Sequence, residues 1–205
     1  MTRSRVPVIP TIVVAVAVAA MIGLGLWQLL DRLPKKEAFL AQLAANPGKP
    51  AVVFPIVPDD RLLFRHSSVE CRDPAGQQIA GAGGAGYRVI VRCRTAANGP
   101  AVAVQLGTTR DPNATIAWHG GRVGGYVGHA PDSRALITTL FDRRPQPMML
   151  IAAAPPAGLA ANRPPDTAAI ANNHLAYAGQ WFFFAAIATV IYGLALRRRK
   201  PPHST

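Results

Sequence analysis

Two long apolar runs, one near each end, dominate the hydrophobic pattern of this 205-residue chain. Residues 12–30 contain no charged side chain, and neither do residues 175–196. Each run matches the roughly 20 residues that a helix needs to cross a hydrocarbon core of about 30 Å. We therefore predict transmembrane helices at 12–30 and 174–196, a short N-terminus at 1–11 and a basic tail at 197–205.

The charges beside these runs predict how the chain is inserted. Arg3 and Arg5 precede the first run, and Arg197, Arg198, Arg199 and Lys200 follow the second. Basic flanks stay on the cytoplasmic side, so residues 31–173 are expected outside, in the periplasm of a bacterial inner membrane. The first run could instead be a cleaved secretion signal, but its apolar part is too long and no small-residue cleavage site follows Leu30.

Between the runs, the pattern changes to short β-rich segments separated by Gly, Pro, Asn and Asp. A short interfacial helix and a turn are predicted at 31–50, a β domain at 51–154 and a Pro/Ala-rich linker at 155–173. The fold class is thus membrane α+β, with a small antiparallel barrel or sandwich between two spans. The candidate strands are Val52–Val57, Leu62–Cys71, Tyr87–Thr95, Ala101–Leu106, Thr115–His119, Ala135–Leu140 and Met148–Ala153.

The segment at 87–94 is the clearest of these strands. Tyr87, Val89, Val91 and Cys93 alternate with Arg88, Ile90, Arg92 and Arg94 on the opposite face. The glycine-rich stretch 81–86 before it contains the spacing of a nucleotide-binding fingerprint. It lacks the preceding strand and following helix that such a motif requires, so we interpret it as a loop.

Charge and cysteine content narrow the function classes. The net charge is +12, but six of the 22 basic residues lie in the two tails and the others are scattered, which argues against nucleic-acid binding. Membrane lipid is a more suitable neighbour for such a chain. Cys71 and Cys93 are the only cysteines, and in an oxidising compartment they could form a disulfide or remain two buried thiols. Their spacing fits no zinc or Cys-x-x-Cys redox pattern.

The external histidines do not indicate an enzyme. Ser67 and Ser68 adjoin His66, but neighbouring residues of a strand point to opposite faces. His119 and His129 lie in glycine-rich regions without metal-site spacing. No nucleophile and base are paired as a hydrolase requires, so we expect these histidines to be structural and the protein not to be an enzyme.

His174 stands apart because it is placed at the outer membrane boundary, where the second run begins. Tyr177 and Trp181 follow at positions that share its helical face, and Trp27 and Gln28 lie near the outer end of the first run at a similar depth. One reading is an aromatic belt with a histidine among lipid headgroups. The other is a haem cleft between two helices, since a neutral imidazole binds haem iron.

The terminal segments resemble the surfeit locus protein 1 family. The residues that carry the resemblance are Gly25-Leu26-Trp27-Gln28-Leu29 with Arg32 and Lys35, Asn173-His174-Leu175-Ala176-Tyr177-Ala178 with Trp181-Phe182, and the closing Arg197-Arg198-Arg199. Gly86-Tyr87-Arg88-Val89 is similar to the family's central strand. The likeness follows nearly the whole chain in order.

This resemblance implies an assembly factor for haem–copper cytochrome c oxidase, with the oxidase catalytic subunit and the haem a synthesis machinery as partners. It makes His174 the expected metal ligand of a transient haem a. Trp27, Tyr177 and Trp181 are then expected to line the cleft, and Arg32 to meet a propionate. A scaffold that chaperones oxidase subunits without a cofactor is the alternative.

The middle of the chain departs from the family pattern. The Asn-Arg-Gly-Trp element of the family is replaced by Gln105-Leu106-Gly107-Thr108, which keeps only the glycine. Asp31 replaces the first arginine of an early pair, and the family's glycine-x-phenylalanine is missing near Cys71. The resemblance therefore supports the membrane helices more strongly than the external domain.

Overall fold

The computed structural model describes residues 7–96, 99–132, 134–142 and 144–198. The basic residues Arg3, Arg5, Arg199 and Lys200, on which the predicted orientation rests, lie outside that range. The chain divides into a helical unit, Met1–Phe39 with Ile170–Thr205, and a sheet unit, Leu40–Ala169. Each unit is described by itself.

Two helices of the described chain are long and apolar enough to span a membrane. The first is α1 (Val8–Trp27), which continues through a π-helical turn (Gln28–Arg32) into α2 (Leu33–Ala45). The second is α4 (His174–Arg198). Helix α1 starts earlier than the apolar run because Pro10 falls in its first turn, where a missing N–H costs no helical hydrogen bond.

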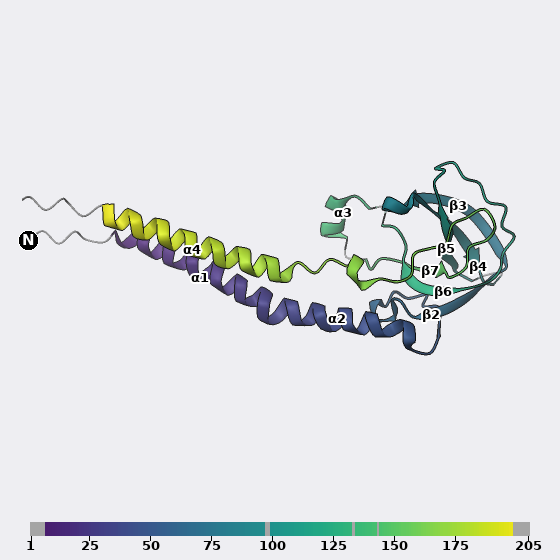
Figure 1. The fold of residues 1–205 in the computed structure, drawn as a ribbon, viewed down its shortest axis with the longest axis horizontal. Coiled ribbons are helices and arrows are strands. Elements are labelled where there is room, and N and C mark those ends of the chain that lie inside the picture. The colour runs from purple at the N-terminus through teal and green to yellow at the C-terminus, as the bar shows by residue number, and fades with distance from the viewer. Residues whose placement is uncertain (1–6, 97–98, 133, 143, 199–205) are drawn as a thin grey trace, which may run out of the picture. The chain divides into compact units, whose positions relative to one another are not determined.

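Helices α1 and α4 lie side by side and run in opposite directions (Figure 1). At one end, the hydroxyls of Thr11 and Tyr192 are 2.5 Å apart. Near the C-terminal end of α1, Gly25 is buried against the ring of Phe182, so close that a Cβ at this glycine would lie 2.6 Å from Cε1. Buried alanines on α4 complete this close contact, as small residues commonly do between membrane helices.

Seven strands form one sheet in the order β1-β2-β6-β7-β5-β4-β3. Their bounds are β1 Val52–Val53, β2 His66–Cys71, β3 Asp73–Gly81, β4 Tyr87–Arg94, β5 Ala101–Thr109, β6 Gly121–His129 and β7 Met148–Ala152. The sheet is open and mixed, which differs from the expected antiparallel barrel or sandwich. The pairs β1·β2 and β5·β7 are parallel. The second follows from topology, since β7 enters between two strands of opposite direction and must run parallel to one of them.

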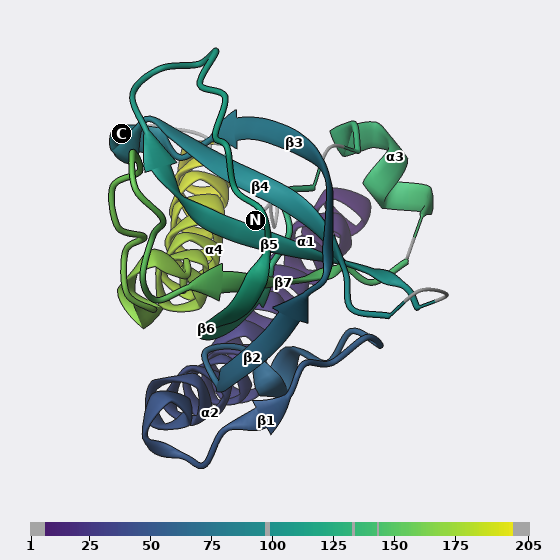
Figure 2. The same ribbon diagram turned by 90° about the vertical axis from the view of Figure 1, so that its right-hand side faces the viewer.

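The open sheet curls, so that β2, next to one edge, leads directly into β3 at the other edge (Figure 2). Strands β2 and β3 are separated only by Arg72, yet β2 pairs with β6 and β3 pairs with β4. The Arg72 N–H donates to the Arg94 carbonyl at 3.0 Å. Next to it, Cys71 and Cys93 form a disulfide with their Cα atoms 5.0 Å apart, which settles the choice that the sequence left open.

The inside of the curl is the hydrophobic core of the sheet unit. It is built from the alternating apolar residues of the strands, and Val89, Val104, Val127 and Leu150 are among its buried members. Helix α2 ends at Ala45, and the buried side-chain amide of the next residue, Asn46, donates to the carbonyls of Arg61 and Leu63 at 2.9 and 2.7 Å.

Two expected strands are absent from the described residues. Ala135–Leu140 was expected as a strand, but helix α3 (Leu136–Phe141) occupies this segment. The strands before and after this segment, β6 and β7, are each paired on both sides, so neither has a free edge to which the segment could pair. Side-chain hydrogen bonds from Arg144 hold the pKa of Asp142, at the end of α3, well below its usual range. Thr115–His119 is irregular rather than extended.

Conversely, β6 lies where the glycine content indicated turns. A Cβ at Gly125 would lie 2.0 Å from the Ile151 carbonyl oxygen, so only glycine lets β7 approach here. The first part of the predicted linker is also ordered: Thr108 and Ala160 exchange two backbone hydrogen bonds of 2.9 Å. The Gln105–Thr108 segment, which departs from the family pattern, is therefore the part of β5 that holds this returning chain.

Candidate functional site

A polar contact between His174 and Gln28 joins the C-terminal end of α1 to the N-terminal end of α4. His174 is the first residue of α4, and its Nδ1 lies 2.7 Å from Oε1 of Gln28, the first residue of the π-helical turn. An amide oxygen only accepts hydrogen bonds, so with this amide orientation Nδ1 carries the proton. The lone pair of the imidazole is then on Nε2, where it can bind a metal ion or accept a further hydrogen bond.

The start of α4 explains why this histidine is held at the helix end. The Tyr177 N–H donates to the Asn173 carbonyl at 3.0 Å, which begins the helix at His174. One residue earlier, the side-chain oxygen Oδ1 of Asn172 is buried and has no hydrogen-bond partner among the described residues. A buried acceptor without a donor is uncommon in a folded protein and is a reason to look for a missing group.

Trp27 and Arg32 form a second contact, within the first helix. The guanidinium carbon of Arg32 lies 4.7 Å from the centre of the Trp27 ring. Residues five apart would point in different directions on an α-helix. The π-helical turn brings them together because its hydrogen bonds join residues i and i+5.

Arg32 keeps a free positive charge beside this ring. The neighbouring carboxylate of Asp31 pairs with Lys35 at 2.5 Å. In the part of the chain that the structure describes, no carboxylate lies within ion-pair distance of Arg32. The guanidinium is therefore available to an acidic group of a bound molecule.

The other predicted site residues lie on α4. Tyr177 follows His174 by less than one turn and is 50% exposed, whereas Trp181 is half-buried two turns along the same face. Trp181 also contacts the edge of Phe184, with ring centres 6.5 Å apart. Trp27 is 44% exposed, and its ring contacts Arg32. The residue that contacts His174 is instead Gln28, which follows Trp27 in the chain.

Sequence reasoning omitted Gln28 and Asn172 from the site. The spacing of the partly buried positions on α1 contains the missing signal. Thr11, Val14, Val18, Met21, Gly25 and Gln28 recur every three or four residues and form the face toward α4. This phase selects Gln28 and excludes Trp27.

The external histidines are accounted for differently. His66 packs on the ring of Tyr126, with centres 4.5 Å apart, and Nε2 of His129 lies 2.9 Å from Asp60 Oδ1. His119 is exposed. Within the described ranges, no group of three or more His, Cys, Asp or Glu side chains could hold a metal ion.

These features define a class of protein. A curled β-sheet unit lies between two apolar helices in the sequence, and a histidine lies where the two helices meet at one end. A family model described as the SURF1 family matches residues 15–186, and the chain belongs to this family, as the terminal motifs predicted. The family is linked to cytochrome oxidase assembly. No curated protein and no solved structure matches the chain.

Proposed function

We propose that this protein is an assembly factor for haem–copper cytochrome c oxidase that binds haem a at the outer ends of α1 and α4 and helps to insert it into the catalytic subunit. The observation that carries the proposal is the hydrogen bond between His174 and Gln28. Histidines that bind metals almost always donate their other ring N–H to an oxygen acceptor, which fixes the ring and raises its basicity. His174 has this arrangement, with Nε2 left for iron.

The surrounding residues fit the rest of such a molecule. The half-exposed rings of Trp27 and Tyr177 offer apolar surface to a macrocycle. Arg32, whose charge no described carboxylate compensates, suits a propionate. Haem a would supply an iron centre that takes an imidazole as axial ligand, while the protein's own residues hold and orient it. The proposed role is that of a carrier, not of an enzyme.

The disulfide supports the proposed location in a bacterial inner membrane. Disulfides persist in oxidising compartments such as the periplasm, and Cys71 and Cys93 are bonded within the sheet unit. With the basic flanks of the two spans in the cytoplasm, the sheet unit would be periplasmic and could meet the oxidase subunit from that side.

The decisive experiment is co-expression with haem a synthesis, followed by visible spectra of the purified full-length protein. We expect the wild type to carry haem a, and His174→Ala to lose most of it. His119→Ala, which alters an exposed histidine of the sheet unit, is the matched control and should keep it. Equal haem in the wild type and His174→Ala would refute the ligand. A haem-free wild type would refute the carrier role.

A second candidate is a cofactor-free scaffold for oxidase subunits. The observation in its favour is the small-residue contact of α1 and α4, formed by Gly25, Ala178 and Ala185, because it leaves the larger apolar side chains on the outer faces of the helix pair. Those faces could pack against the spans of another subunit. Crosslinking to the catalytic subunit together with a haem-free spectrum would favour this role.

A further inference from the structure

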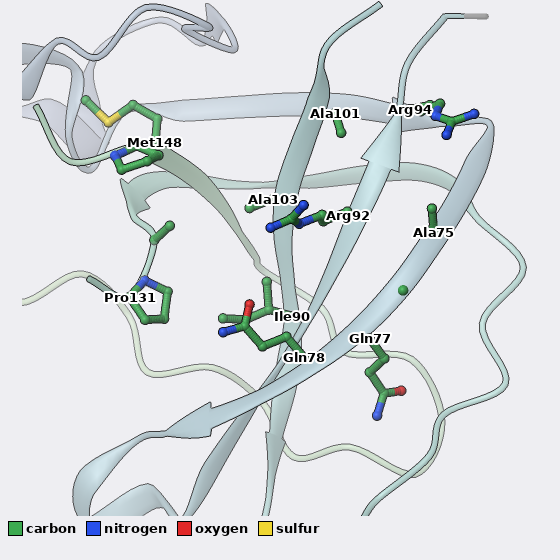
Figure 3. Close-up of a pocket in the computed structure, with 13 residues that line it drawn as sticks. Ala75, Gln77, Gln78, Ile90, Arg92, Arg94, Ala101, Ala103, Pro131 and Met148 are labelled. Atoms are coloured by element: carbon green, nitrogen blue, oxygen red, sulfur yellow. The ribbon is translucent and has the colours of Figure 1, made fainter. Parts of the chain in front are cut away.

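A hollow on the outer face of the sheet has no role in the proposed haem site. It lies over β3, β4 and β5 and is bordered by the segments around Pro131 and Pro147 (Figure 3). Its volume is about 810 Å³, within the range of about 300–1,000 Å³ that is typical of small-molecule sites. All its lining residues belong to the sheet unit.

The two arginines of this hollow differ in their neighbours. Arg94 lies opposite Asp73 on β3 and forms an ion pair with it at 3.4 Å. Arg92, two residues earlier on the same face of β4, lies opposite Ala75 on β3 and Ala103 on β5. Among the described residues, no carboxylate pairs with Arg92. The hollow therefore has one uncompensated positive charge.

The hollow exists because the residues beside Arg92 are small. Ala75 and Ala103 flank the arginine on both sides, and larger residues at these positions would fill the space next to its guanidinium. Figure 3 shows the Arg92 side chain extending over Ala103 toward the middle of the lining residues. The head group is thus presented to the hollow instead of being folded onto an acidic neighbour.

The rest of the lining is mostly apolar. Ile90, which is 3% exposed, contributes to the floor, and Met148 and Pro131 form one side. Gln78, opposite Ile90 on β3, adds an amide beside this surface. An apolar wall with a few polar groups that fix orientation is the usual make-up of a small-molecule site.

We propose that this hollow binds a small organic carboxylate, with the carboxylate on Arg92 and a compact apolar body against Ile90, Met148 and Pro131. Guanidinium and carboxylate are both planar and form two parallel hydrogen bonds. The charge favours a monoanion over a phosphate dianion, because Asp73 already neutralises Arg94. The site is independent of haem binding, since it shares no residue with it.

The test measures saturation-transfer NMR signals of three probes on the full-length protein in detergent. Benzoate has the apolar body and the charge, benzamide has the body without the charge, and acetate has the charge without the body. We expect benzoate to bind at least about fivefold more tightly than either of the others, because only benzoate uses both parts of the site.

Three variants localise the binding. Arg92→Gln should weaken benzoate about tenfold, since it removes a charge-assisted hydrogen bond. Ala103→Leu should also abolish binding, by filling the hollow while the charge stays. Arg110→Gln, which removes an exposed arginine outside the hollow, is the matched control and should change it less than twofold. The proposal is overturned if benzamide binds as well as benzoate, or if Arg92→Gln and the wild type bind benzoate equally.

Discussion

At the scale of single residues, the pair of Gln28 and His174 determines whether the helix ends form a metal site. The amide oxygen of Gln28, 2.7 Å from Nδ1, orients the ring and assigns its proton. Under the proposed function, Gln28 is a positioning residue, because it would act on the ligand through His174. Its position at the start of the π-helical turn, in phase with Gly25, aims it at α4.

We expect Gln28→Leu to lower haem affinity about 10- to 100-fold, the usual cost of removing a hydrogen-bond partner of a metal ligand. Gln28→Glu keeps an oxygen acceptor and should retain binding, with a shifted absorption maximum because a carboxylate makes the imidazole more basic. Haem titration and visible spectra of both variants measure the effect. Unchanged affinity and spectrum in Gln28→Leu would contradict the role of this residue.

At the scale of elements, the contact between α1 and α4 depends on Gly25. A methyl group there would lie 2.6 Å from the Phe182 ring, whereas one at Gly23 would meet nothing within 4 Å. We expect Gly25→Ala to destabilise the helix pair by about 1–3 kcal/mol, as overpacking does. Gly23→Ala, the matched control, should be neutral or stabilise the helix by up to about 1 kcal/mol.

Thermal unfolding of the two variants in the same detergent measures this difference. The sign matters more than the size, because the same substitution is made two residues apart on one helix. A midpoint for Gly25→Ala at or above that of Gly23→Ala would show that the helices do not pack through this glycine.

The elements also show what sequence patterns can and cannot predict. The apolar runs were sufficient to predict the two long helices, and the alternation at Tyr87–Arg94 was sufficient to predict β4. Burial of one face of a strand makes apolar residues recur at a fixed spacing in the sequence. Strand β6 has no such pattern, since its glycines resemble a turn, and Gly125 and Gly128 are explained only by the approach of Ile151 on β7. Likewise, Ala135–Leu140 has strand composition, but the strands before and after it, β6 and β7, are already paired on both sides.

The candidate site also shows what the sequence could not predict. His174, Trp27 and Arg32 were selected from the sequence by depth and residue type. Neither criterion reports which way a side chain points, and Gln28 was therefore missed. The π-helical turn, which joins Arg32 to Trp27, has no evident sequence signal here.

At the scale of the whole molecule, the proposed topology predicts where reporters work. Green fluorescent protein fused after Thr205 should fluoresce, since both chain ends are expected in the cytoplasm. Alkaline phosphatase inserted in the exposed loop at 110–113 should be active, because this enzyme needs an oxidising compartment. An inactive phosphatase with a fluorescent C-terminal fusion would contradict a periplasmic sheet unit.

The disulfide also affects the order in which the sheet can be completed. Cys71 and Cys93 are only 22 residues apart in sequence, but β6, β7 and β5 separate their strands in the sheet. A chain delivered across the membrane from its N-terminal side exposes both cysteines before residues 101–152 arrive. We therefore expect the disulfide to join the end of β2 to β4 before β6, β7 and β5 are added between these two strands.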